Sequence, residues 1–157
     1  MALYARDGVP EACLHLQGRH DLDVNLILFA AFVGAQRGEG LTASNLKAAR
    51  DRVAAWHREV VRPLRAVRKR LTTGPPPAPD GITAHLRRWI QQVEIEAELI
   101  ELDELGDLAA SWESIPASGS PAESAALAID AVVQASSPKP IDDLDRQAIQ
   151  AIAEAAV

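Results

Sequence analysis

A proline-rich segment, TTGPPPAPDG at residues 72–81, separates two long stretches in which apolar residues recur three or four positions apart. The first row consists of Val53, Trp56, Val60, Leu64, Val67 and Leu71, and the second of Ile82, Leu86, Trp89, Ile90, Val93, Ala97 and Ile100. Such spacing is typical of helices that pack lengthwise against one another. We therefore predict a long antiparallel helix pair joined by a stiff connector at 72–81.

The rest of the chain also carries the signals of helices. A short first helix is expected to end at Gly18, and Asp21 or Asp23 is expected to cap a buried apolar helix over 23–37. Two alanine-rich helices are expected over 121–136 and 143–157. Pro63 predicts a kink or a local break about one turn before it, because proline lacks an amide N–H. With no stretch of period two, the predicted fold class is all-α, a small helical bundle built around the long pair.

The length of 157 residues suits one domain with a sizeable core. We expect residues 1–111 to form this helical core and residues 112–157 to form an alanine-rich helical extension packed on it. The later long helix has a second apolar row at Ile95, Leu99 and Leu102. Either the C-terminal helices cover that row, or a second copy of the chain covers it in a homo-oligomer.

The charge balance, with 22 acidic against 16 basic residues, argues against a general affinity for nucleic acid. The apolar run from Val24 to Ala35 is too short for a bilayer, which needs roughly twenty residues. The N-terminal sequence lacks the features of a secretion signal. We therefore expect a soluble cytoplasmic protein with no membrane partner. Cys13 is the single cysteine, which excludes an intrachain disulfide and a thiolate zinc cluster.

Motifs of catalysis are missing from the sequence. The acidic stretch 94–107 lacks the Glu-x-x-His pairs of a di-iron bundle. No His-Glu-x-x-His, Gly-x-Ser-x-Gly, phosphate-loop or dinucleotide pattern is present either. We therefore predict no metal, no cofactor and no catalytic residue.

Asn25 interrupts an otherwise apolar helix. A buried amide without partners costs about 1–3 kcal/mol, so Asn25 either bonds across a helix interface or lines a polar pocket. Gln17 is a possible partner from the preceding helix. Both interpretations stay open at the level of sequence.

Six positive side chains lie within WHREVVRPLRAVRKRL at 56–71. If the long helices fold back at the connector, Arg58 and Arg62 come near the carboxylates at 94–98 and are structural. The same register leaves five arginines without an acidic neighbour, namely Arg65, Arg68, Arg70, Arg87 and Arg88. Arginine suits carboxylate and phosphate oxygens, so this end is either a solvated surface or a site for a small anion or an acidic protein.

Three blocks of sequence, LYARDGVPEACLHLQGRHDLDVNLILFAAFVG, WHREVVRPLRAVRKRL and LRRWIQQVEIEAE, resemble an uncharacterised bacterial family of small proteins, a domain of unknown function. The resemblance covers about residues 3–105 and implies a bacterial cytoplasmic protein without an established activity. The positions that match the family's motifs are Tyr4, Cys13, Gln17, Asp23, Asn25, Trp56, Pro63, Arg65, Arg68, Glu94 and Glu98.

These observations favour a non-enzymatic helical interaction module that associates with itself. The alternative is a pocket for a small molecule or anion, or an unrecognised enzyme, built where Asp23 and Asn25 approach Arg65, Arg68 and Glu94. The candidate binding residues are Gln17, Asp23, Asn25, Arg65, Arg68, Arg70, Arg87, Arg88, Glu94 and Glu98.

Overall fold

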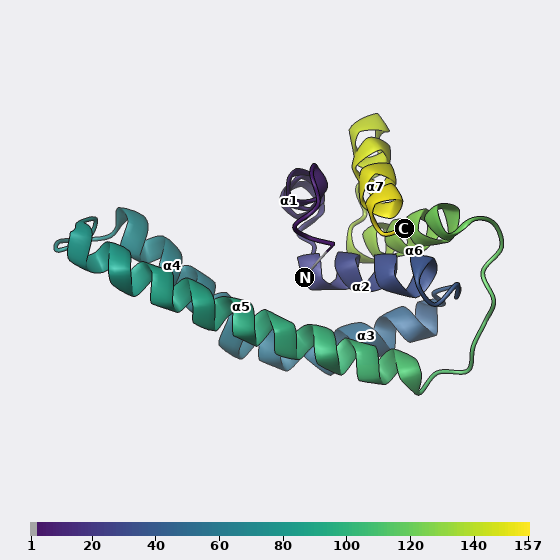
Figure 1. Cartoon of the computed structure of the whole chain (residues 1–157), viewed down its shortest axis with the longest axis horizontal. Coiled ribbons are helices and arrows are strands. Elements are labelled where there is room, and N and C mark those ends of the chain that lie inside the picture. Colours follow the sequence, from purple (N-terminus) through teal and green to yellow (C-terminus); the bar gives the residue numbers. More distant parts are fainter. Residues whose placement is uncertain (1–2) are drawn as a thin grey trace. The chain divides into compact units, whose positions relative to one another are not determined.

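The computed structural model describes residues 3–157, and these residues are mostly helical (Figure 1). The elements in chain order are α1 (Val9–His20), α2 (Val24–Ala35), α3 (Ala43–Trp56), the π-helical segment η1 (His57–Val61), α4 (Arg62–Thr73), α5 (Gly81–Ala110), α6 (Pro121–Ser136) and α7 (Asp143–Ala155). Extended pairing within residues 3–157 is limited to an isolated antiparallel bridge between Glu39 and Pro116. The all-α prediction is confirmed. In this described part, every helix is too short or too polar to span a bilayer.

The chain forms two compact units. The first, here called the terminal unit, contains the residues up to 50 together with 106–157, and the second, the hairpin unit, contains residues 51–105. Helices α6 and α7 thus group with α1 and α2. The boundary predicted near residue 111 stays a prediction about domain organisation.

In the terminal unit, α2 packs along α6, while α1 packs on α7 (Figure 1). Helix α2 is apolar nearly all round, and most of its side chains are buried, as the sequence predicts. Gly34 allows the close approach of α2 to α6, because a Cβ atom at this position would lie 2.5 Å from backbone atoms of Ala125. The core of this unit therefore depends on one small residue at a helix crossing.

The ends of the helices follow the local sequence with one exception. Asp23 caps α2, since its carboxylate accepts the amide N–H of Asn25 at 2.9 Å. Capping boxes open α6 at Ser120 and α7 at Asp142. The predicted end of α1 at Gly18 is wrong, because the helix continues to His20 and ends at Asp21 in the left-handed conformation. Burial of the His20 side chain favours this extra turn over the cost of a helical glycine, about 1 kcal/mol.

In the hairpin unit, α5 returns antiparallel to α4 after the connector at 74–80 (Figure 1). The segment η1 lies directly before Pro63, where the sequence predicts a local break. Proline removes an amide donor, and its ring displaces the carbonyl group four residues earlier. The chain accommodates Pro63 by widening one turn into a π-helix, so the predicted disturbance lies at the expected position but the helical run from α3 to α4 is not broken.

Candidate functional site

Four of the predicted site residues come together in the hairpin unit. The Nε of Arg65 donates to Glu94 at 3.1 Å, and its Nη2 donates to Glu98 at 2.6 Å. Arg68 also donates to Glu94, through Nε and through Nη2, the latter at 3.2 Å. Glu94 is buried, whereas both arginines are partly exposed. The result is a charge-balanced cluster that joins α4 to α5.

The electrostatics of Glu94 reflect two opposing influences. Burial raises the pKa of its carboxyl group, but the hydrogen bonds from Arg68 and Arg65 outweigh burial and leave the pKa below its ordinary value. Glu94 is therefore ionised at neutral pH and serves as an acceptor rather than as a proton donor.

This pairing corrects the predicted register of charges. Arg65 and Arg68 were expected to lack acidic neighbours, and Arg58 was expected to reach the carboxylates at 94–98. Instead, Arg58 pairs with the adjacent Glu59 on the surface at 2.6 Å. Side chains of a helix lean toward its N-terminus. In an antiparallel pair, two side chains that touch therefore belong to residues slightly later in the sequence than the two residues whose Cα atoms lie side by side.

A contact to the backbone agrees with this explanation. The indole N–H of Trp56 donates to the carbonyl oxygen of Ala97 at 3.0 Å. Trp56 and Ala97 are close to being opposite one another in the antiparallel register that results when the two long helices fold back at the connector. The prediction thus fails for the long charged side chains and not for the path of the helices.

The segment η1 adds a further pair that the sequence analysis missed. Nδ1 of His57 lies 3.1 Å from a carboxylate oxygen of Glu101, whose side chain is fully buried. One helical turn along α5, Glu104 pairs with Arg52. The recurrence of an acid every three or four residues, at 94, 98, 101 and 104, was the available signal. Ion pairs therefore lie along the contact between α5 and the preceding helical run of α3, η1 and α4. This contact is called the seam of the hairpin unit.

The other predicted arginines do not join this cluster. Arg87 donates to the hydroxyl oxygen of Thr72 at 3.3 Å, and Arg88 lies 3.5 Å from Nδ1 of His85. Within residues 3–157, neither of them, nor Arg70, has a carboxylate at ion-pair distance. These three arginines stay candidates for an anion site.

Gln17, Asp23 and Asn25 belong to the terminal unit. Asp23 acts as the cap of α2, and Asn25 is buried and has a polar partner. A single site that combines these residues with Arg65, Arg68 and Glu94 stays a prediction.

Several large apolar side chains of α5 are exposed, although Glu94 and Glu101 of the same helix are buried. Ile82, Leu86, Trp89, Val93 and Ile100, here called the α5 row, are between 45% and 80% exposed. Helix α4 buries none of its side chains fully, and its Val67 is also exposed. By contrast, the second row at Ile95, Leu99 and Leu102 is half-buried. The apolar surface left open is thus the row that was predicted to face the helix partner.

A family model described as a protein of unknown function, DUF2390, matches residues 1–105. The chain belongs to this family. Comparison with curated proteins gives no match, and comparison with solved structures gives none either. The DUF2390 region includes the whole hairpin unit, whereas α6 and α7 follow it.

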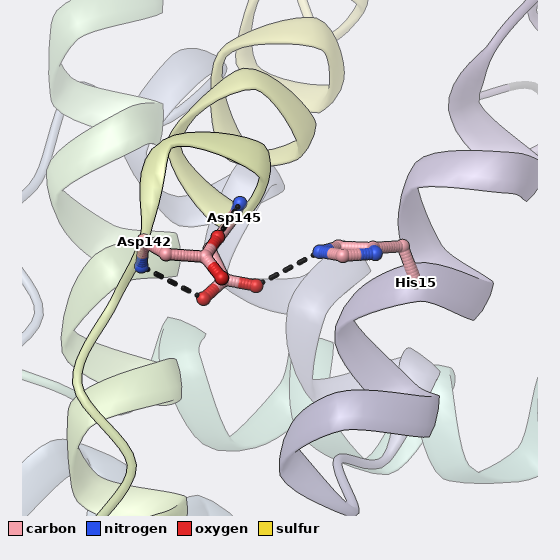
Figure 2. A group of neighbouring side chains, drawn as sticks. All are labelled: His15, Asp142 and Asp145. Atoms are coloured by element: carbon pink, nitrogen blue, oxygen red, sulfur yellow. Dashed lines mark hydrogen bonds and ion pairs between the residues drawn. The ribbon is translucent and has the colours of Figure 1, made fainter.

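A second charged cluster joins the DUF2390 region to those C-terminal helices (Figure 2). Asp145 of α7 is fully buried and pairs with His15 of α1 at 2.9 Å, with Arg19 at 2.9 Å and with His20 at 3.0 Å. Its carboxylate also accepts the backbone N–H of Asp142 at 3.0 Å. One carboxylate thus completes the capping box of α7 and clamps α7 to α1.

Ligand atoms of His15, Asp142 and Asp145 lie within 4.8 Å of one another, close enough for one cation to bridge. Arg19, however, pairs with both carboxylates, with Asp142 at 2.9 Å and with Asp145 at the same distance. A guanidinium at this position repels a metal ion and already supplies the positive charge. The cluster is therefore better suited to hold two helices together than to bind a metal.

Two pKa values support a structural role for the terminal unit. Burial raises the pKa of Asp145, but the N–H of Asp142 and the side chains of His20, His15 and Arg19 lower it well below the ordinary range. Burial raises the pKa of the Cys13 thiol to about 12. A thiol of this kind is not a nucleophile at neutral pH, and Cys13 is a small core residue as expected.

Proposed function

We propose that this protein is a helical interaction module and that the α5 row is its binding surface. The supporting observation is that the hairpin unit buries Glu94 and Glu101 in its seam while the five large apolar side chains of the α5 row stay exposed. Burial of apolar surface drives association, at about 25 cal/mol per Å². Large exposed apolar patches on soluble proteins are typical of interaction sites.

The α5 row has the geometry of a helix that inserts into a groove or packs on another helix. Its members are separated by four, three, four and seven residues, so they share one face of α5. Helical recognition uses anchors at these intervals. Trp89 is central in the row and largely exposed, and tryptophan is enriched among the residues that dominate binding energies.

A shallow hollow of about 430 Å³ extends this surface at one end of the row. Ile100 and Trp56 line it together with Val53, and the charged side chains of Arg52, Glu101 and Glu104 complete its wall. An apolar side chain of a partner fits such a hollow, with the exposed pair of Arg52 and Glu104 at its rim. The proposal requires no catalytic step.

Substitution of Trp89 tests the proposal. Full-length tagged protein is compared with Trp89→Lys and with a control, Leu127→Lys, which places the same charge at an exposed apolar position of α6. We expect polypeptides, including untagged copies of this chain, to co-purify with the parent and the control and to be lost from Trp89→Lys. Circular dichroism checks that helix content is equal. If Trp89→Lys retains the same polypeptides as the parent, the α5 row is not the binding surface.

A further inference from the structure

We propose that the connector end of the hairpin unit is a second binding surface and that its partner is an acidic helix of another protein. The surface, here called the basic end, consists of Lys69 and Arg70 of α4 and of Arg87 and Arg88 of α5. Around the helix axis, Arg87 and Arg88 are turned about 100° and 200° from Leu86 of the α5 row. The basic end is therefore distinct from that row, and this inference goes beyond the proposed function.

Acidic residues are nearly absent from this end of the hairpin unit. Between Val60 and Val93 the chain has seven lysine and arginine residues and one acidic residue, Asp80. The carboxylate of Asp80 accepts the backbone N–H groups of Ile82 at 2.9 Å and of Thr83 at 2.8 Å, so it caps the start of α5. The single acid of this stretch thus already has a structural role.

The seam shows where the acids end. On α5, residues 98, 94, 91 and 87 lie three or four positions apart, so they form one line along the helix. Its first two members, Glu98 and Glu94, are the acids that bind arginines of α4. The line then continues toward the connector with Gln91 and Arg87. Acids therefore give way first to an amide and then to a cation.

The facing line of α4 does not change in the same way. Arg65, Lys69 and Thr72 lie four and three positions apart. Arg65 binds the two acids of the α5 line, and Arg87 donates to the hydroxyl oxygen of Thr72 at 3.3 Å. Lys69 lies between these two contacts, where the α5 line supplies Gln91. The basic residues of the seam therefore continue beyond its acids.

Four positive charges are left without an acidic partner. In the described part of the chain, residues 3–157, none of the four side chains of the basic end has a carboxylate at ion-pair distance. Three of them are exposed and Arg87 is half-buried. Like charges this close repel one another, because the Debye length at physiological ionic strength is about 8 Å. A partner with several carboxylates removes the repulsion and accepts hydrogen bonds from the arginines.

The pairing of Arg65 indicates the kind of partner that fits. Its guanidinium bonds to Glu94 and to Glu98, which lie one turn apart on a helix. A partner helix with acids four positions apart offers the same pair of carboxylates to the arginines of the basic end. Each exposed pair contributes little, so binding requires several such acids in one segment.

A nucleic acid fits this surface less well. The protein has a net charge of −6, and the acidic stretch of α5 that begins at Glu94 repels a phosphate backbone that extends past the basic end. Proteins that bind single strands place aromatic rings among their basic residues. Trp89 lies two positions after Arg87, so it points to nearly the opposite side of α5, where its ring packs against that of His85.

Binding of a designed peptide tests the inference. The probe is a fluorescent alanine-rich peptide with glutamates four positions apart, and the same peptide with glutamines in their place is the neutral control. In fluorescence anisotropy at low ionic strength, we expect the full-length protein to bind the acidic peptide at least tenfold more tightly than the neutral one. Arg70→Glu combined with Arg88→Glu should weaken this binding at least tenfold.

The matched control variant is Lys139→Glu combined with Arg146→Glu, which changes the net charge equally but lies in the terminal unit. It should bind the acidic peptide as the parent does, with equal helix content in circular dichroism for all proteins. An equal loss in both double variants would mean that only the overall charge matters, and it would overturn the inference. A parent that binds both peptides equally would also overturn it.

Two further measurements identify the partner and separate this surface from the α5 row. Single-stranded DNA of the same charge as the acidic peptide should bind more weakly than the peptide, and binding that is equally tight or tighter would overturn the acidic helix as partner. Trp89→Lys, which tests the proposed function, should not weaken binding of the acidic peptide. A loss in that variant would overturn the basic end as a surface of its own.

Discussion

The two units differ in how many of their apolar side chains they bury. In the terminal unit, α2 is buried on nearly all sides, and a glycine lets its backbone meet that of α6. In the hairpin unit, the buried positions of α5 include Glu94 and Glu101, and the α5 row remains open. The first unit has an apolar core to which α1, α2, α6 and α7 all contribute. The second has a polar seam and leaves the α5 row exposed, which is the surface that we propose binds a partner.

This difference suggests that the terminal unit contributes most of the stability, whereas the hairpin unit provides the surface proposed for binding. Partly exposed ion pairs contribute little to the free energy of folding, and salt screens them. We therefore expect the hairpin unit to unfold locally more readily than the terminal unit. A closed apolar core and a buried clamp make the terminal unit the more sensitive to single substitutions. The following predictions test this contrast, beginning with the largest expected effect.

Asp145→Ala should cause the largest loss of stability. It removes the shared partner of His15, Arg19 and His20 and leaves their donors unpaired beside α7. Breaking a buried ion pair on one side costs about 3–5 kcal/mol. Because His15 and Arg19 are partly exposed, we expect about 3 kcal/mol in urea denaturation. We call the cluster of Asp145 with His15, Arg19 and His20 the clamp. A loss of stability below about 1 kcal/mol would show that folding does not depend on the clamp.

Gly34→Ala should destabilise the terminal unit by about 1–3 kcal/mol, the usual effect of overpacking. The added Cβ atom would meet backbone atoms of Ala125, which cannot move aside as a side chain can. The matched control is Gly18→Ala, which adds the same methyl group within α1 where nothing lies within 4 Å. The control should be neutral or stabilising. Equal unfolding midpoints for the two variants would contradict the close contact of α2 with α6.

Glu94→Gln should have a smaller effect, of about 1–2 kcal/mol, since it weakens charged hydrogen bonds from Arg65 and Arg68 that solvent partly screens. Arg58→Ala removes only a surface pair with Glu59 and should change the free energy of unfolding by less than about 0.5 kcal/mol. Thermal denaturation distinguishes the two. A larger effect for Arg58→Ala would restore the register that the sequence alone predicts.

The pH dependence of the clamp gives a finer test. The pKa of Asp145 is lower in the folded protein than in the unfolded chain, so its stabilising effect is complete above the unfolded value, about 4, and declines as the pH falls toward the folded value. Between pH 7 and pH 3, the free-energy difference between the parent and Asp145→Asn should shrink by about 1 kcal/mol. Urea titrations at both pH values measure it. A difference that grows toward pH 3 would have the wrong sign.

The smallest expected effect is a change in melting temperature that depends on Arg70 and Arg87. If Arg70 and Arg87 hold an anion, phosphate should raise the melting temperature of the parent according to its occupancy. Arg70→Ala combined with Arg87→Ala should abolish this increase. An equal response in the double variant would mean that this end of the hairpin unit is only a solvated surface.

Much of the fold was predictable because its signals are local. Asp23, Pro63 and the connector act through their own backbone neighbourhood, and their positions mark α2, η1 and the hairpin correctly. The end of α1 was missed because burial of His20 is a tertiary effect that overrides the glycine at position 18. Local rules therefore locate elements but do not decide every boundary.

The site was less predictable, for two physical reasons. Both apolar rows of α5 have the same helical period, so the sequence cannot decide which of them stays open. The clamp joins His15 to Asp145, which are 130 residues apart, and Asp145 already has a sufficient local role in the capping box of α7. Only tertiary structure reveals that one carboxylate serves both purposes.

The π-helical turn before Pro63 also requires a set number of residues between α3 and α4. Each residue of an α-helix advances the side-chain direction by about 100°, and a π-helical turn contains one residue more than an α-helical turn. The extra residue in His57–Val61 therefore sets the phase between Trp56, which reaches Ala97, and Arg65, which reaches Glu94. A one-residue deletion here would satisfy the backbone of a regular helix but turn one set of contacts away from α5. In this segment, the number of residues carries as much information as their identity.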